Sequence, residues 1–218
     1  LDHDSICAHL YAGDFKAHLD TGGGLTAMME QGEFFLDVFR NQMEAHQLHF
    51  DSLKVNLPVV HLEMESGRDN PICNFLLMKG YGYKSMHALL ETSKEEGLKG
   101  NMDIYSFKSD SLQLDTIHLS IFPKENTQGF RAQVHNNRKN PQYVFNSILD
   151  GELMNDGALA HLQFFDQKNR PGVDLRVRMH MEPEGFLFTV DSEHPLIAYH
   201  NFNVTPENAY VFLRDDMQ

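Results

Sequence analysis

The sequence predicts an α+β protein in which an N-terminal helical segment is followed by an antiparallel β-sheet. Apolar residues recur at helical spacing over residues 5–49, and from residue 50 onward they alternate with polar residues. Turn-forming residues separate the alternating stretches, as in the segment Lys168-Asn169-Arg170-Pro171-Gly172. We therefore expect residues 1–50 to form helices packed on a sheet, and residues 51–218 to form an antiparallel α+β domain.

Two helices are expected in the first fifty residues, separated by the glycines at positions 22–24. Asp4 or Ser5 can cap the first helix, whose apolar positions are Ile6, Cys7, Leu10, Tyr11, Phe15 and Leu19. The second helix has a wide apolar stripe from Leu25 to Met43, which is typical of a helix buried on more than one side.

Strands are expected wherever apolar and polar residues alternate. The clearest stretch is Val173–Met181, and the others are Leu53–Leu57, Val60–Met64, Ile117–Ile121 and Phe130–Val134. This alternation is typical of half-buried antiparallel strands. Because turn sequences separate them, residues 157–204 are expected to form a four-stranded meander.

Three short sequences place a capping side chain before a proline, which is a typical helix start. They are Asn70-Pro71, Asn140-Pro141 and Thr205-Pro206. Strand-like segments flank the first two, so we expect two strand-helix-strand-strand-strand repeats, over 53–123 and 130–192, followed by a C-terminal strand and helix. The first repeat requires a strand over residues 85–96, whereas their composition favours a helix, and both alternatives stay open.

The composition argues against several classes of protein. The 218 residues carry a formal net charge of −13, which disfavours binding to the phosphate backbone of nucleic acids. No stretch approaches the roughly 18 consecutive apolar residues of a membrane span. A chain of this length with two cysteines does not need a disulfide, so we expect a soluble, cytoplasmic protein. Its start at Leu1 is also compatible with a removed targeting segment.

The predicted order of elements resembles that of the glyoxalase and extradiol dioxygenase superfamily. The resemblance lies in Val60-His61-Leu62-Glu63-Met64, the short helix that follows, and Lys79-Gly80-Tyr81-Gly82-Tyr83. It implies a divalent metal bound inside a curved sheet, with His61 as the first ligand and His118 or Glu63 as a later one. Independently of the resemblance, His61 and Glu63 share one face of a strand, and imidazole with carboxylate suits Zn, Fe or Mn. The alternative is that these polar side chains face solvent.

A cysteine-dependent hydrolase is a second enzymatic hypothesis. The first turn of a helix would favour a thiolate at Cys7, and a papain-like order of Cys, His and Asp is provided by Cys7, His87 and Asp103 or Asp110. The aspartates at positions 2, 4 and 14 oppose this hypothesis, because nearby negative charge raises the pKa of a thiol.

Arginine and histidine alternate with apolar residues on several predicted strands, and they share one face of the sheet if these strands are neighbours. The residues are Arg131, His135, Arg176, Arg178 and His180, with His118 and Ser120 on a further strand. Such a face would accept a carboxylate or phosphate group, or an acidic protein partner.

We therefore expect a protein that binds a small anionic molecule or a protein partner, through this face or through the cavity beneath the long helix. A metal- or cysteine-dependent enzyme is one alternative, and an acidic chaperone or adaptor is another. The sequence leaves the oligomeric state open.

Overall fold

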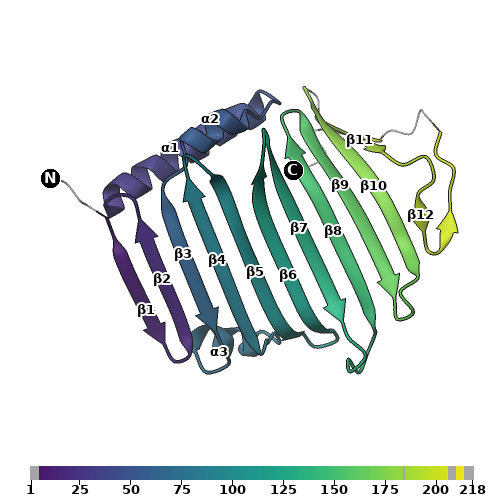
Figure 1. The fold of residues 1–218 in the computed structure, drawn as a ribbon, viewed down its shortest axis with the longest axis horizontal. Coiled ribbons are helices and arrows are strands. Elements are labelled where there is room, and N and C mark those ends of the chain that lie inside the picture. The colour runs from purple at the N-terminus through teal and green to yellow at the C-terminus, as the bar shows by residue number, and fades with distance from the viewer. Residues whose placement is uncertain (1–4, 184, 206–209, 214–218) are drawn as a thin grey trace.

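In the residues that the structure describes, 5–183, 185–205 and 210–213, the chain forms one large antiparallel sheet and three α-helices (Figure 1). The structure is a computed structural model. Neighbouring strands in space are nearly always neighbours in sequence, in the order β1-β2-β3-β4-β5-β6-β7-β8-β9-β10-β11-β14. Short turns therefore connect most of the strands, and the sheet is a single continuous layer.

The strands are β1 (Cys7–Ala12), β2 (Phe15–Thr21), β3 (Val60–Ser66), β4 (Ser85–Ser93), β5 (Gly97–Lys108), β6 (Gln113–Lys124), β7 (Thr127–Asn136), β8 (Phe145–Met154), β9 (Gly157–Asp166), β10 (Pro171–Glu182), β11 (Gly185–Val190), β12 (Leu196–Ile197), β13 (His200–Asn201) and β14 (Tyr210–Leu213). The short strand β12 pairs with β10 and with β13, and these two short strands are not part of the main strand order.

The register of the strands defines two faces of different chemistry. Residues directly opposite one another on antiparallel strands point to the same side of a sheet, and adjacent residues along a strand point to opposite sides. Side chains on the side of His18 are mostly polar or charged, and we call this side the polar face. Side chains on the side of Leu19 are mostly aliphatic or aromatic, and we call it the apolar face.

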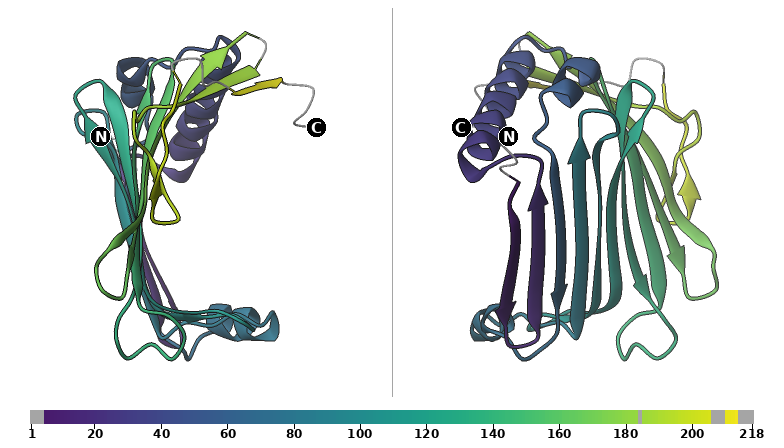
Figure 2. Two further views of the ribbon diagram at one scale, coloured as in Figure 1. Left: turned by 90° about the vertical axis from the view of Figure 1, so that its right-hand side faces the viewer. Right: turned by 60° about the vertical axis from the view of Figure 1, so that its left-hand side comes forward.

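The helices lie at the two ends of the strands. Helices α1 (Leu25–Glu44) and α2 (Phe50–Val55) cover one end of the apolar face, where the buried cluster of Leu48, Leu53 and Met181 forms. Helix α3 (Pro71–Met78) lies at the other end, and the edge-on view shows α1 and α3 on the same side of the sheet (Figure 2). Within the described part of the chain, no helix combines the length and apolar character needed to cross a membrane.

The sequence prediction was correct for the α+β character, for the antiparallel strands after residue 60 and for α3. The side chain of Asn70 caps α3 by accepting a hydrogen bond from the Cys73 N–H at 2.8 Å, and Pro71 occupies the first turn. Residues 85–93 form the strand β4, which resolves the ambiguity of that segment. The β-pairing on both sides of β4 outweighs the helical propensity of its residues.

The predicted helix over the first twenty residues was wrong, because these residues form the hairpin β1–β2. Its turn contains Gly13 at φ +67°, a conformation that favours glycine. The Asp14 N–H donates to the Asp69 carbonyl at 2.9 Å, which ties the turn to the loop before α3. The hairpin is therefore held by cross-strand and tertiary bonds that a periodic apolar pattern does not reveal.

Two further helix and strand predictions were wrong in this part of the chain. The expected strand at Leu53–Leu57 does not form, because residues 53–55 are the last residues of helix α2. Leu53 and Leu57 are four residues apart and both are buried at the same end of the sheet. Helix α1 was expected to be buried on more than one side, yet none of its residues is fully buried. It covers the sheet along one stripe only.

The predicted second repeat was also wrong, because no helix follows Asn140-Pro141. The Asn140 side chain donates to the Gln113 carbonyl and to Asp115, and β8 begins at Phe145. The unit over 130–192 consequently lacks the helix that the repeat required. Of the expected meander, β9, β10 and β11 form, followed by the short β12 and β13. The third helix start falls largely on residues 206–209, outside the described residues, and β14 follows as a strand.

Candidate functional site

Two adjacent rows of side chains cross the middle of the apolar face without a polar residue. One row has one residue from each strand from β1 to β10, and the other extends to β11. The first consists of Leu10, Ala17, Met64, Ala88, Met102, Leu119, Ala132, Leu149, Leu162 and Leu175, and the second of Ala8, Leu19, Leu62, Leu90, Gly100, Ile121, Phe130, Gly151, Ala160, Val177 and Val190. With strands roughly 4.8 Å apart, the first row is about 43 Å long.

These rows are partly open to solvent, because the helices cover only the ends of the face, although the small Ala88 and Gly100 are buried. Leu119 is 40% exposed and Leu162 is 37% exposed, although both lie near the centre of the sheet. A shallow trough of about 320 Å³ lies over Leu62, Met64, Leu90, Met102 and Leu119. The molecule thus carries a broad apolar surface that its own helices leave uncovered.

A second cavity, of about 150 Å³, lies between α1, α2 and the sheet. Phe35, Phe39 and Phe50 line it from the helices, and Leu98, Ile121 and Leu153 line it from the strands. Ile121 also borders the trough, so the apolar surface continues from the open face to beneath α1. This is the cavity beneath the long helix that the sequence predicted as a binding place.

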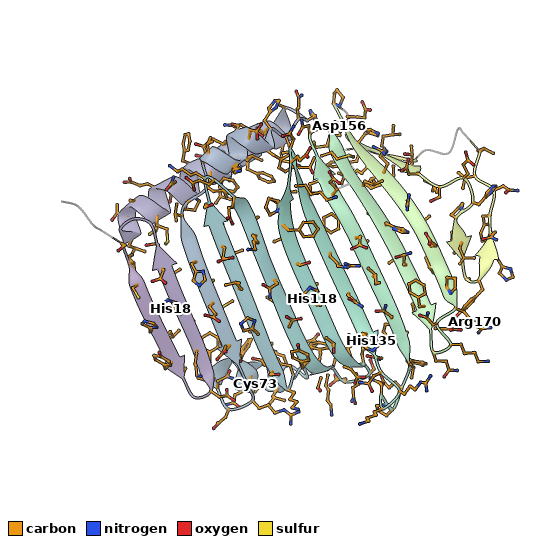
Figure 3. The ribbon with its side chains drawn as sticks, viewed as in Figure 1. His18, Cys73, His118, His135, Asp156 and Arg170 are labelled. Carbon is orange, nitrogen blue, oxygen red and sulfur yellow. The ribbon has the colours of Figure 1, made fainter. Side chains whose placement is uncertain are left out.

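In the part of the chain that the structure describes, eight of the 13 histidines lie on the polar face, each on a strand of the main sheet. They are His9, His18, His61, His87, His118, His135, His161 and His180. Three of them, His18, His118 and His135, are labelled in Figure 3. The five residues predicted to bind an anion, Arg131, His135, Arg176, Arg178 and His180, share this face as the alternation required. They are spread over it, since β7 and β10 are separated by β8 and β9.

Carboxylates accompany the arginines on this face. Arg131 pairs with Asp150 at 3.1 Å, and Arg178 lies 3.6 Å from Asp191. His180 lies 3.4 Å from Asp156. Neighbouring carboxylates therefore partly neutralise the positive charges of Arg131 and Arg178 on this face, which weakens the argument for a free anion site there.

Most histidines of the polar face also contact an acid on the same or a neighbouring strand. His118 Nδ1 lies 2.7 Å from Asp103 Oδ1, and His161 Nε2 lies 2.7 Å from Asp174 Oδ1. Burial acts to raise the pKa of the Asp174 carboxyl, but the hydrogen bonds from His161 and Gln163 outweigh it, and the pKa is lowered. Near the sheet end, hydrogen bonds from Lys124 and Thr127 likewise lower the pKa of Glu152.

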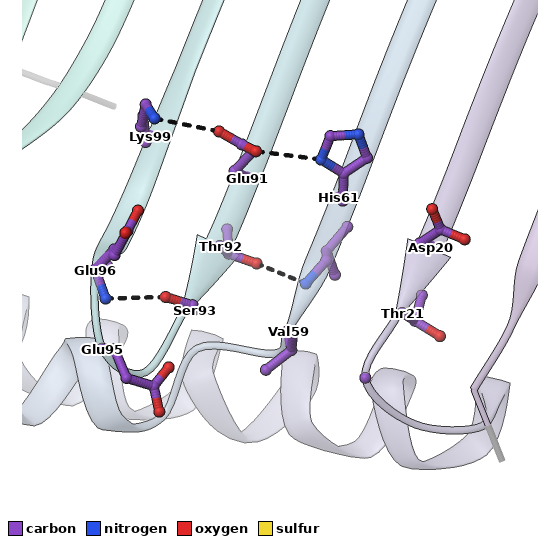
Figure 4. Close-up of a pocket in the computed structure, with 13 residues that line it drawn as sticks. Asp20, Thr21, Val59, His61, Glu91, Thr92, Ser93, Glu95, Glu96 and Lys99 are labelled. Atoms are coloured by element: carbon purple, nitrogen blue, oxygen red, sulfur yellow. Dashed lines mark hydrogen bonds and ion pairs between the residues drawn. The ribbon is translucent and has the colours of Figure 1, made fainter. Parts of the chain in front are cut away.

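The predicted metal ligands His61, Glu63 and His118 do not meet. His61 Nδ1 contacts Glu91 at 3.3 Å, and Glu63 contacts His87 at 3.4 Å. His118 lies on β6, three strands from β3, which is about 14 Å away. The close-up shows His61 in a chain of contacts with Glu91 and Lys99 at the rim of a surface pocket (Figure 4). His61, Glu63 and His118 each contact a different neighbouring side chain, and the three share no common centre.

The predicted cysteine triad does not assemble in the structure either. His87 and Asp103 are direct partners on β4 and β5, but Cys7 lies on β1, at least about 14 Å from His87. A hydrogen bond to Asp20, with lesser contributions from burial and from the charge of Asp20, raises the pKa of the Cys7 thiol. Asp110, the alternative acid, lies beside Gly80 at the far end of the strands. No helix N-terminus activates Cys7, because it belongs to a strand.

No protein-family model, curated protein or solved structure matches this chain.

Two features of the structure were not predicted from the sequence: the partly open apolar rows, and a cluster of metal-binding residue types on the β1–β2 hairpin. The signal for the rows was the large number of alternating strands compared with the single long helix able to cover them. The hairpin cluster consists of Cys7, His9 and His18, whose donor atoms lie within 4.8 Å of one another. It could have been found from the Gly13-Asp14 turn, which places His9 opposite His18.

Proposed function

We propose that this protein binds the aliphatic chain of an amphiphilic molecule, such as a fatty acid, on its apolar face and in the cavity beneath α1. The observation that carries the proposal is the pair of uninterrupted apolar rows that remain exposed at the centre of the sheet. Exposed apolar surface of this extent marks a binding site for an apolar partner.

The total accessible surface area of the chain is larger than that of a compact monomer of the same mass. A compact monomer of 25.0 kDa would expose about 10,200 Å², whereas this chain exposes 14092 Å². Much of the difference arises because the sheet is a single layer. Burying even part of this surface under an aliphatic chain would be favourable, at roughly 25 cal/mol per Å² of apolar area.

The shape and composition of the surface favour a flexible chain as the occupant. The cavity beneath α1 and the trough both border Ile121, so a flexible linear chain could lie across the two. Their volumes of about 150 and 320 Å³ together fall within the roughly 300–1,000 Å³ of typical ligand sites. Met64, Met102 and Met179 lie on the apolar face, and methionine adapts to ligands of variable shape.

The polar end of such an amphiphile would meet a mixed environment at the mouth of the cavity. Lys54 and Lys124 line it together with Asp51, Glu96 and Glu125. Lys124 is already paired with Glu152 at 2.5 Å, so Lys54 is the cation best placed for a carboxylate head group. The anionic ligand expected from the sequence would then bind at this cavity, with its chain on the apolar face.

Displacement of a polarity-sensitive fluorescent probe by palmitate tests the proposal. Leu119→Asp should weaken palmitate binding at least about tenfold, because one buried leucine contributes roughly 1.5–3 kcal/mol. Ser120→Asp is the matched control, since it introduces the same charge at the adjacent residue on the polar face. Leu162→Asn provides a second, uncharged change in the same row, and circular dichroism verifies that each variant folds.

Two results would overturn the proposal. The first is the absence of saturable palmitate binding by the wild-type chain, or equal binding by Leu119→Asp and Ser120→Asp. The second is sedimentation as a dimer that Leu119→Asp dissociates while palmitate has no effect, because a second copy would then be the occupant of the apolar face.

A further inference from the structure

We propose that Cys7, His9 and His18 form a Zn²⁺ site on the polar face of the β1–β2 hairpin. One donor atom from each residue lies within 4.8 Å of the other two. The site lies on the opposite side of the sheet from the apolar face, so this proposal does not depend on amphiphile binding.

The hairpin register brings the ligands together. His9 is directly opposite His18, and Cys7 is directly opposite Asp20. Because side chains two residues apart on a strand share a face, these four groups form a compact square on one side of the hairpin. The position at the outer edge of the sheet leaves the square accessible to an ion from solvent, since Cys7 and His9 are exposed.

The distances are close to those that a tetrahedral zinc ion imposes. Zn–N bonds of about 2.0–2.1 Å and Zn–S bonds of about 2.3 Å place two bound nitrogens about 3.3 Å apart and a nitrogen and sulfur about 3.6 Å apart. The Nδ1 atoms of His9 and His18 are 3.0 Å apart, and Cys7 Sγ is 3.6 Å from the other ring nitrogen of His9, Nε2. A single ion would use only one nitrogen of His9, and one donor atom from each of the three residues lies within 4.8 Å of the other two. The two rings are stacked, so binding requires them to turn until their nitrogens converge, and their surface position permits this rotation.

Asp20 acts as a positioning residue for His18. Its carboxylate Oδ2 lies 2.6 Å from His18 Nε2, which holds the proton on that nitrogen and directs the Nδ1 lone pair toward His9. A carboxylate behind a metal-bound histidine is the usual outer-sphere arrangement of zinc sites. When zinc binds, the Cys7 thiol loses its proton to solvent and the sulfur coordinates as thiolate, while water completes the fourth position.

The nature of the donors selects the metal. Two imidazoles and one thiolate are borderline to soft ligands, which suit zinc better than magnesium or calcium. The other described cluster of such residue types, Glu63, Glu65 and His87, is mainly carboxylate and already contains the contact between His87 and Glu63. The cysteine-containing cluster is therefore the better zinc site.

Protection of a thiol from alkylation tests the site directly. Cys7 is exposed and Cys73 is buried, so iodoacetamide should modify only Cys7 in the folded, untagged chain. One equivalent of Zn²⁺ should slow this reaction at least about tenfold in the wild type, and elemental analysis should find one zinc per chain. The double variant His9→Ala with His18→Ala should lose both the protection and the bound zinc.

Two further variants make the result specific. His135→Ala removes an exposed histidine from the same face on β7 and should leave the protection unchanged. Asp20→Asn removes the carboxylate that orients His18 and should weaken zinc binding by about 10–100-fold, even though the Cys7 thiol then loses its proton more easily. The proposal is overturned if Zn²⁺ does not slow alkylation of Cys7, or if it slows it equally in the double variant.

Discussion

Asn136 provides the sharpest test of how the sheet is held together. It is fully buried at the end of β7, and its side chain bridges to the start of β6. Its Oδ1 accepts a hydrogen bond from the Asp115 N–H at 2.9 Å, and its Nδ2 donates to the Gln113 carbonyl at 3.1 Å. The variant Asn136→Ala would remove both bonds. The Asp115 N–H would lose its side-chain partner, whereas the Gln113 carbonyl would keep the hydrogen bond from the Asn140 side chain.

The expected cost follows from these two groups. The Asp115 N–H left without its partner costs about 1–3 kcal/mol, and the lost hydrogen bond to the Gln113 carbonyl costs about 0.5–1.5 kcal/mol, so the variant should lose about 1.5–4.5 kcal/mol of unfolding free energy. A chain of this size shifts its Tm by roughly 2–4 °C per kcal/mol, so the Tm should fall by at least about 3 °C. Urea unfolding followed by circular dichroism, together with a thermal scan, measures both quantities.

The neighbouring residue serves as the control. Asn137 is exposed, and its side chain accepts one hydrogen bond, from the Lys139 N–H at 2.8 Å. Asn137→Ala should therefore cost less than about 1 kcal/mol. If Asn136→Ala destabilises the protein no more than Asn137→Ala does, the assignment of Asn136 as a structural bridge is wrong.

Two further predictions concern the backbone and acid stability. A Cβ at Gly157 would lie 1.8 Å from the Met179 carbonyl oxygen, so Gly157→Ala should clearly lower the Tm. A Cβ at Gly32, in the middle of α1, would meet no atom within 4 Å, so Gly32→Ala should raise the unfolding free energy by about 0.5–1 kcal/mol. Equal effects of the two variants in thermal scans would contradict this prediction. Hydrogen bonds from Asn70 and the Asp69 backbone lower the pKa of the Asp14 carboxyl, so its stabilisation is present above an unfolded pKa of about 4 and is lost as pH falls through the lower folded value. Asp14→Asn should accordingly have a lower Tm at pH 7 and a smaller further drop on acidification, and a drop as large as that of the wild type would argue against this role.

The parts of the fold that the sequence predicted are those set by local chemistry. Alternation predicted β10 over Val173–Met181, and the Asn70-Pro71 pair predicted α3 with its cap. The first twenty residues were misassigned because Leu10 and Phe15 fit a helical stripe as well as a hairpin, and only pairing with β3 selects the hairpin. At Asn140-Pro141 the same cap-and-proline pattern predicted a helix, but none forms, because the Asn140 side chain donates a hydrogen bond to the Gln113 carbonyl at the beginning of β6.

The candidate sites depended on which strands are neighbours, which one sequence cannot provide. Alternation correctly placed Arg131 and Arg176 on one face, but not the strands that separate them or the aspartate that pairs with Arg131. His9 and His18 were assigned to a helix and therefore did not stand out as partners. The exposure of Leu119 was not predictable from alternation either, because alternation indicates a covered face without identifying what covers it.

The two faces of this single-layer sheet have opposite effects on its association through the exposed apolar surface. On one side, acids and histidines form cross-strand pairs such as His118 with Asp103, which stabilise neighbouring strands at modest cost in desolvation. The same side contributes carboxylates to a chain with a net charge of −13, and this charge opposes association through the apolar side. The polar face thus allows the apolar face to stay open, and a ligand that binds only the folded sheet would add stability in proportion to RT ln(1 + [L]/Kd). An increase in Tm with palmitate that is lost in Leu119→Asp and kept in Ser120→Asp would link that stability to the apolar face.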